Sequence, residues 1–260
     1  MKALRTILPV ALGIAVLAAW QIAVREARLP VYLLPAPSDI WAAFLADFPS
    51  LMASLFATLK VTAAAFLLAL LLGVALAVAF SQSRIVENAL YPYAVILQVT
   101  PVVAIAPLIL IWVGYDRIEL ALVLIAFLVA FFPILSNTTL GLKSADHNLI
   151  DLFRLYGANR WQILWRLQLP GALPHILGAA KIAGGLALIG AVVAEFVAGS
   201  GTATGLAWRI IEAGNRLQIA KMFACLTLLA LLGIAIFSLL SALEYALLRQ
   251  WHESALEKQA

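Results

Sequence analysis

Long apolar stretches restrict the fold of this chain more than any single motif does. An α-helix rises about 1.5 Å per residue, so roughly 20 apolar residues are needed to cross the hydrocarbon core of a bilayer. The sequence contains six such stretches, at Ile7–Val24, Thr58–Phe80, Ala89–Val113, Glu119–Leu135, Leu177–Ala198 and Met222–Leu248. It therefore predicts an all-α, polytopic membrane protein with about six transmembrane helices.

The composition supports this class and excludes others. Of the 260 residues, 65% are hydrophobic and 12% are charged, so a globule in water would expose too much apolar surface. The net charge of +4 is small, and no basic patch with interleaved aromatic residues indicates nucleic-acid binding. Cys225 is the only cysteine and lies in an apolar run, which excludes an internal disulfide and a thiolate metal cluster and predicts a small buried residue.

The first apolar stretch has two interpretations. Lys2 and Arg5 precede it, and this pattern is also typical of a secretory signal peptide. No small-x-small cleavage motif closes the stretch, because Ala19 runs directly into Trp20 and Gln21. We therefore expect a retained helix.

Prolines interrupt the third and fourth apolar stretches. Pro92, Pro101 and Pro107 lie in the third, and Pro133 lies late in the fourth. Proline removes a backbone hydrogen bond and clashes with the preceding turn, so we expect these helices to be kinked or broken. A broken membrane helix frees backbone groups that can face a solute path, although a kink that serves only packing is the commoner case.

A polar segment, Ser144–His175, separates the fourth and fifth stretches and must lie outside the lipid. Its first part predicts a short helix that Gly157 closes in a left-handed conformation. In its second part, Asn159 is a candidate N-cap with Gln162 completing a capping box, and Pro170 is expected to end that helix. Such a hairpin either presents a charged face to a soluble partner or lies on the lipid headgroups with snorkelling arginines.

The basic residues indicate the orientation. With a cytoplasmic amino terminus, the inside segments hold modestly more Lys and Arg than the outside segments. The inside set comprises Lys2, Arg5, Arg84, Lys143, Arg154, Arg160, Arg166, Arg249 and Lys258. We therefore expect both termini and the polar segment to face the cytoplasm.

The run from Asp151 to Trp161, followed by Leu169 and Pro170, resembles the cytoplasmic signature of the binding-protein-dependent ABC importer permeases. That signature reads Glu-Ala-Ala, a short spacer, Gly, a longer spacer and Leu-Pro. Here the leading triplet is Asp-Leu-Phe, which keeps the acidic position but not the small residues. The resemblance extends to LLPAPSDIW (33–41), TPVVAIAPLILIWVG (100–114), FFPILSNTTLGL (131–142) and VVAEFVAGS (192–200). Within the superfamily the chain is most similar to the nitrate, sulfonate and taurine group, and its later motifs to the branch for pyrimidine precursors of thiamine.

The resemblance implies a type I importer permease of the bacterial inner membrane, acting as a homodimer. It implies two cytoplasmic ATPase subunits and an extracytoplasmic solute-binding protein as partners, with the helix before Gly157 docked into an ATPase cleft. The ATPase-coupling residues it implies are Asp151, Leu152, Phe153, Arg154, Gly157, Ala158, Asn159, Arg160, Trp161 and Pro170. The chain has no G-x-x-x-x-G-K-[ST] phosphate loop, so we expect no enzymatic activity and no cofactor here, with ATP and Mg²⁺ bound by the partner.

Candidates for the translocation pathway come from the residues themselves. Gln98, Thr100 and Pro101 in the interrupted third stretch can offer polar contacts to a small solute. Glu195 is a candidate because an ionisable group is costly at membrane depth, so one found there is by default a candidate for a functional role. Its alternatives are a place at the external headgroups or a role in holding a loop.

Two other classes of membrane protein fit the sequence less well. An ion-coupled secondary transporter commonly shows two related halves and intramembrane charges, and the sequence shows no clear repeat and few such charges. An intramembrane enzyme needs a catalytic cluster within its spans, and the histidines at 147, 175 and 252 all lie in or beside polar segments.

The function predicted is thus an importer permease subunit that forms the pathway for a small solute. The solute is expected to be a nitrate-, sulfonate- or taurine-like anion or a pyrimidine-type heterocycle. Residues 1–57 are expected to form a transmembrane helix with an external segment. Residues 58–248 are expected to form the permease core with a cytoplasmic coupling loop at 141–175, and residues 249–260 a cytoplasmic tail.

Overall fold

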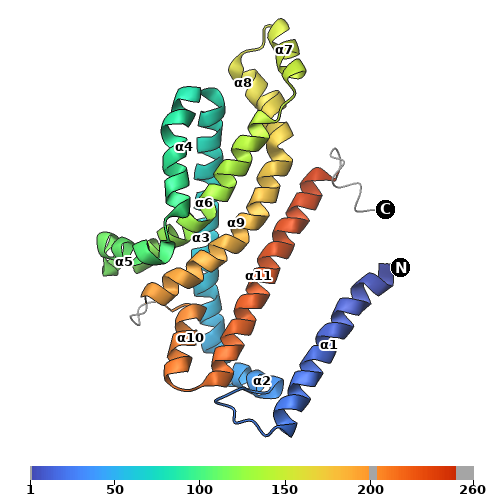
Figure 1. The fold of residues 1–260 in the computed structure, drawn as a ribbon, viewed down its shortest axis with the longest axis vertical. Helices are drawn as coiled ribbons and strands as arrows, with labels where there is room; N and C mark the ends of the chain where they lie inside the picture. The colour runs from blue at the N-terminus through green and yellow to red at the C-terminus, as the bar shows by residue number, and fades with distance from the viewer. Residues whose placement is uncertain (1, 199–203, 250–260) are drawn as a thin grey trace. The chain divides into compact units, whose positions relative to one another are not determined.

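The computed structural model describes residues 2–198 and 204–249, and every element in these ranges is helical (Figure 1). The tail predicted at 249–260 lies outside them except for Arg249. The α-helices are α1 (Lys2–Glu26), α2 (Pro37–Ala46), α3 (Phe48–Gln82), α4 (Arg84–Val99), α5 (Val102–Val113), α6 (Ile118–Lys143), α7 (His147–Leu155), α8 (Arg160–Ile163), α9 (Leu169–Ala198), α10 (Leu206–Asn215) and α11 (Ile219–Leu248). A 3₁₀ turn, η1 (Tyr115–Arg117), precedes α6, and a π-helical segment, η2 (Leu164–Gln168), joins α8 to α9.

Five continuous helical segments are long and apolar enough to cross a membrane within the described ranges. They are α1 from Ile7, α3, α6, the run from α8 through α9, and α11. A sixth is reached if α4 and α5 count as one span, but these two helices are bent by 103° at Thr100 and Pro101. The expectation of a broken third span is therefore confirmed.

The bend between α4 and α5 follows from its residues. Thr100 precedes a proline and has an extended backbone, with φ −69° and ψ 125°, because the proline ring disfavours the helical conformation there. The Thr100 hydroxyl donates a hydrogen bond of 2.7 Å to the Ile96 carbonyl, which stabilises the end of α4. Pro101 then starts α5 in a new direction.

The chain divides into two compact units. Unit 1 comprises residues 1–57 and 204–231, and unit 2 comprises residues 58–203 and 232–260. In unit 1, the core forms between α3, α10 and α11, where Leu51, Leu206 and Leu228 pack with Cys225. Cys225 is fully buried, as predicted from its apolar surroundings.

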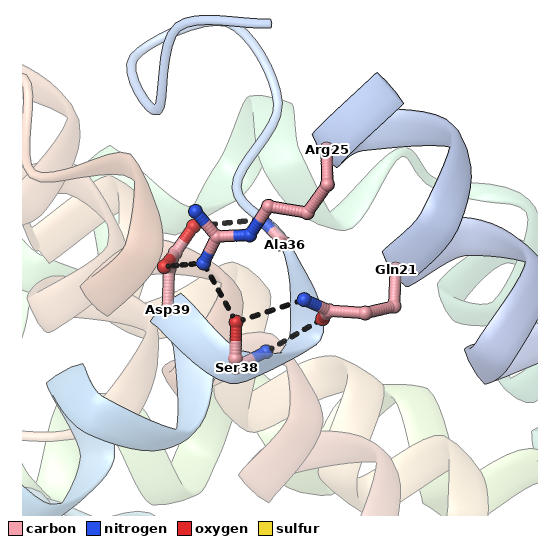
Figure 2. A network of polar contacts seen from close by, with 5 residues as sticks. All are labelled: Gln21, Arg25, Ala36, Ser38 and Asp39. Atoms are coloured by element: carbon pink, nitrogen blue, oxygen red, sulfur yellow. Dashed lines mark hydrogen bonds and ion pairs between the residues drawn. The ribbon is translucent and has the colours of Figure 1, made fainter. Parts of the chain in front are cut away.

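A polar clamp ties α1 to α2 within unit 1 (Figure 2). Arg25 donates hydrogen bonds to Asp39 at 2.8 Å and to Ser38 at 2.9 Å, and Gln21 exchanges two bonds with Ser38. Asp39 also accepts the Ala36 amide at 3.1 Å, which satisfies a free donor at the start of α2. The LLPAPSDIW motif therefore sets where α2 begins and fastens it to α1.

Unit 2 is built on α6 and α9, which lie side by side with α3 packed against them (Figure 1). Small residues permit this close approach. A Cβ at Gly190 would lie 2.7 Å from the Ala126 Cα of α6, and one at Gly184 would lie 2.5 Å from a Leu240 methyl of α11. Helices in a membrane associate through such close packing, because lipid supplies little hydrophobic driving force between them.

Candidate functional site

The α7–α8 hairpin lies at one end of α6 and α9 (Figure 1). Asp146 starts α7 by accepting the Asn148 amide at 2.9 Å. Two bonds close α7: the Gly157 amide donates to the Arg154 carbonyl at 2.9 Å, and the Ala158 amide to the Phe153 carbonyl at 3.0 Å. This pair of bonds is the Schellman motif, which requires a left-handed residue.

Gly157 supplies that residue with φ +75°, so the predicted closing position is confirmed. A Cβ at Gly157 would meet nothing within 4 Å, which means that conformation and not space selects glycine here. Asn159 then caps α8. Its side chain accepts the Gln162 amide at 2.9 Å, and the Gln162 side chain accepts the Asn159 amide at 2.8 Å, as the predicted capping box requires.

The prediction that Pro170 ends the second helix is wrong. The helix runs from α8 through the π-helical η2 into α9, and Pro170 lies in the first turn of α9. The Leu169 amide donates to the Leu164 carbonyl, five residues earlier, which is the π pattern. We attribute the tolerance of Pro170 to this wider turn, because it moves the preceding carbonyls away from the proline ring.

The hairpin exposes large apolar side chains although it also carries charges. Leu155 and Tyr156 are 84% and 85% exposed, and Trp161 and Trp165 are 59% and 67% exposed. A hollow of about 360 Å³ lies between α7 and η2, lined by Phe153, Gly157, Arg166 and neighbouring residues. Such an exposed apolar surface with a charged rim is typical of a protein-docking site.

The structure brings nine of the ten expected coupling residues together in this hairpin, from Asp151 to Trp161, and places Pro170 at the start of α9. Asp151 and Arg154 form an ion pair of 3.2 Å on the exposed face of α7. Both side chains are 68% exposed, so the pair adds little to stability. Their charges are available to a partner.

The four pathway candidates fall in two places. Gln98, Thr100 and Pro101 lie at or beside the bend between α4 and α5, and Gln98 is exposed. Glu195 is buried in the last turn of α9, where its carboxylate accepts the Thr58 hydroxyl of α3 at 2.8 Å. This contact joins α9 to the part of α3 that belongs to unit 2.

An ion pair inside unit 2 was not identified from the sequence. Lys181 of α9 and Glu244 of α11 meet at 2.5 Å, and their side chains are only 21% and 18% exposed. The sequence contained a signal for this pair, because Lys181 and Glu244 are both charged residues within apolar spans. Lys181 also lines a hollow of about 550 Å³ together with Asn137, His175 and Phe237.

Outside the apolar spans, the polar groups of α10 form one cluster in unit 1. Arg209 donates to Ser54 at 3.1 Å and to Glu212 at 2.7 Å, and Arg216 approaches Glu212 to 3.0 Å. The Arg209 hydrogen bond holds the pKa of the Glu212 carboxyl below its ordinary value, against the opposing effect of burial. These contacts fasten α10 to the start of α3.

Comparison with known proteins decides the family. Residues 69–251 match the family of binding-protein-dependent transport system inner membrane components, and this range contains the α7–α8 hairpin. The chain belongs to that family. It is a permease subunit of an ABC importer, a multi-pass membrane protein that belongs to the non-catalytic class of subunits.

The permease is similar along most of its length to several relatives. It is 38% identical over 249 residues to the riboflavin transport system permease protein RibX of Chloroflexus aurantiacus, covering 95% of this chain and 90% of RibX. It is 38% identical over 163 residues to the formylaminopyrimidine transport permease protein ThiX of Halalkalibacterium halodurans, covering 63% of each chain. It is 31% identical over 234 residues to the putative aliphatic sulfonates transport permease protein SsuC of Escherichia coli, covering 89% of this chain and 87% of SsuC.

Solved structures show the same fold. The inward-facing MetNI methionine ABC transporter matches with a TM-score of 0.63 and 22% identity, covering 75% of this chain and 95% of the other. An amino acid ABC transporter crystallised with histidines matches with a TM-score of 0.64 and 17% identity, covering 80% of this chain and 97% of the other. The predicted type I importer fold is therefore confirmed.

Proposed function

We propose that the permease couples to a cytoplasmic ATPase through the α7–α8 hairpin. The observation that carries the proposal is the exposed apolar surface of Leu155, Tyr156 and Trp161 in the hairpin and of Trp165 in η2. The hairpin also presents the charged residues Asp151, Arg154 and Arg160. An exposed apolar surface next to charged residues is typical of a protein interaction site. The docked helix would be α7, with Gly157 setting the direction of the turn that follows it.

The family supports an assembly of several subunits around this chain. Two copies of the permease would form the pathway, two ATPase subunits would bind ATP and Mg²⁺ below, and a solute-binding protein would deliver the solute outside. Closure of the ATPase pair would draw the two α7–α8 hairpins together and switch the pathway between inward- and outward-facing states. The basic-residue bias supports this orientation, with the hairpin and both termini in the cytoplasm of a bacterial inner membrane.

The direct test is purification of the tagged permease from its native membrane in mild detergent, followed by mass spectrometry of the bound proteins. We expect an ATPase subunit that carries a phosphate loop to remain bound. A matched preparation with both Leu155 and Tyr156 changed to serine should lose that subunit while keeping its helical content. Retention of the ATPase by the double variant would contradict docking through this surface.

For the solute, we favour a small heterocycle over an inorganic anion. The relatives RibX and ThiX are named for riboflavin and formylaminopyrimidine transport. The hollow lined by Asn137, His175 and Phe237 combines hydrogen-bonding groups with an aromatic ring, as a planar heterocycle would require. Its lysine, Lys181, is already neutralised by Glu244, so it offers no unpaired positive charge to an anion.

The solute class is tested by thermal unfolding of the purified permease with candidate solutes. Riboflavin or formylaminopyrimidine should raise the melting temperature, and taurine at the same concentration should not. The Asn137→Ala variant should lose the shift, because Asn137 lines the hollow, while Thr227→Ala in unit 1 should keep it. A rise in melting temperature with taurine alone would contradict the heterocycle proposal and indicate a sulfonate as the solute.

A further inference from the structure

A second polar cavity in unit 2 lies apart from both the coupling surface and the Lys181 hollow. It has a volume of about 530 Å³ and forms where α3 and α6 end and where α4 and α7 begin. We call it the α4–α7 cavity. Its polar lining consists of Ser81, Arg84, Glu87, Asn88, Lys143, His147 and Gln168.

Hydrogen-bond donors dominate this cavity. Lys143 of α6 and Glu87 of α4 form an ion pair, and the Glu87 side chain is only 17% exposed. The one carboxylate in the cavity lining is therefore already paired with a lysine. Among the described residues, none forms a hydrogen bond or ion pair with the side chains of Arg84, Asn88 or His147. The cavity therefore presents the Arg84 guanidinium with no neutralising partner.

The depth of the cavity is indicated by the helices around it. The apolar run of α3 ends at Phe80, which lines the cavity, and Ser81, Gln82 and Ser83 follow. An apolar span that gives way to polar and basic residues marks the boundary between hydrocarbon and headgroups. Basic pockets between transmembrane helices at that level suit the phosphate of a lipid headgroup.

We propose that the α4–α7 cavity binds a phosphate group, with Arg84 as its main ligand and Lys143 and His147 as further donors. Arginine matches phosphate geometry because its planar guanidinium donates two parallel hydrogen bonds to two oxygens. Lys143 keeps N–H donors beyond the one given to Glu87. The phosphate comes from an anionic phospholipid or from a soluble phosphate, and both sources need the same donors.

This site does not rest on the proposed docking of an ATPase. The most exposed apolar residues of the hairpin, Leu155 and Tyr156, lie at the end of α7, whereas the cavity is lined by His147 and Ile150 in the first turn of α7. A bound phosphate would fasten the first turn of α7 to the first turn of α4. Loss of the ligand and loss of the ATPase are therefore separate measurements.

The test measures ligand retention by native mass spectrometry on the purified permease with whichever subunits remain bound. The probes are phosphatidylglycerol, phosphatidylcholine and inorganic phosphate. The variant is Arg84→Gln. The matched control is Arg117→Gln, because Arg117 is also exposed and forms an ion pair of 3.7 Å with Asp116. One basic side chain near a headgroup is worth about fivefold in lipid affinity, so Arg84→Gln should weaken phosphatidylglycerol retention by about fivefold and Arg117→Gln should not.

Each outcome decides the proposal. Retention of phosphatidylglycerol over phosphatidylcholine that depends on Arg84 supports the site and assigns the phosphate to a lipid. Retention of inorganic phosphate that depends on Arg84, without a lipid preference, supports the site and assigns it to a soluble ligand. Equal losses in both variants, or no retention that depends on Arg84, would overturn the proposal, and His147→Gln provides a second variant on the same cavity.

Discussion

Replacing Gly157 with alanine isolates the conformational requirement of the α7–α8 hairpin. The backbone has φ +75° at this residue, and a Cβ would meet no atom within 4 Å. The change therefore introduces no clash, and its cost is that of a left-handed alanine, about 1–2 kcal/mol. Because the hairpin is exposed, this cost falls on the local turn, and it corresponds to about a 5- to 30-fold loss of the docking-competent conformation.

The assay compares Gly157→Ala with Gly171→Ala, which is the same chemical change in the first turn of α9. Gly171 also has open space around its Cβ position but no positive φ, so alanine should be neutral or slightly stabilising there. We expect Gly157→Ala to weaken ATPase binding by about 5- to 30-fold, with the melting temperature of the permease nearly unchanged. Equal ATPase affinity in the two variants would refute the reasoning that the Schellman turn sets the docking geometry.

The remaining predictions concern the scaffold. Thr58→Val should destabilise the permease by about 1–3 kcal/mol in thermal unfolding, because it removes a donor to a buried carboxylate. Thr62→Val should cost less, because the Thr62 hydroxyl donates to the Thr58 carbonyl of its own helix. Gly190→Ala should cost about 1–3 kcal/mol because its Cβ would meet the backbone of α6, whereas Gly185→Ala has open space and should be tolerated. Stability should fall as the pH drops below about 4.5 through the lowered pKa of Glu212, and Glu212→Gln should remove that dependence.

Three results would contradict these predictions. Equal unfolding temperatures for Thr58→Val and Thr62→Val would mean that the hydrogen bond between Thr58 and Glu195 does not stabilise the permease. A well-tolerated Gly190→Ala would mean that α6 and α9 are farther apart than the structure shows. An acid transition of unchanged size in Glu212→Gln would assign the pH dependence to other carboxylates.

The sequence was most informative where interactions are local. The left-handed turn at Gly157 and the capping box of Asn159 and Gln162 each depend on residues within five positions, so the local pattern was enough to predict them. The apolar stretches predicted the spanning helices for the same reason, since length and hydropathy are properties of the segment alone.

The features that the sequence did not predict depend on geometry between or along helices. Pro170 was expected to end a helix, but the π turn before it accommodates the proline ring. The residue types in Leu164–Gln168 give no sequence signal for such a turn. The pairing of Lys181 with Glu244 joins residues 63 positions apart, and only the packing of α9 against α11 reveals it. Proline predicted a break near Thr100, but not its angle, which is 103° in the structure.

Site-specific cross-linking tests most directly the central claim that the α7–α8 hairpin contacts an ATPase subunit. The one native cysteine, Cys225, is fully buried, so a single introduced cysteine is the thiol of this chain that reacts with the cross-linker. Leu155→Cys places a reactive thiol at the exposed end of α7, and Tyr32→Cys, 68% exposed, places one on the side that the proposed orientation assigns to the exterior. In native membranes, a thiol-anchored photo-cross-linker at position 155 should capture an ATPase subunit with a phosphate loop, and one at position 32 should not. Capture of that ATPase from position 32, or its absence from position 155, would contradict the account.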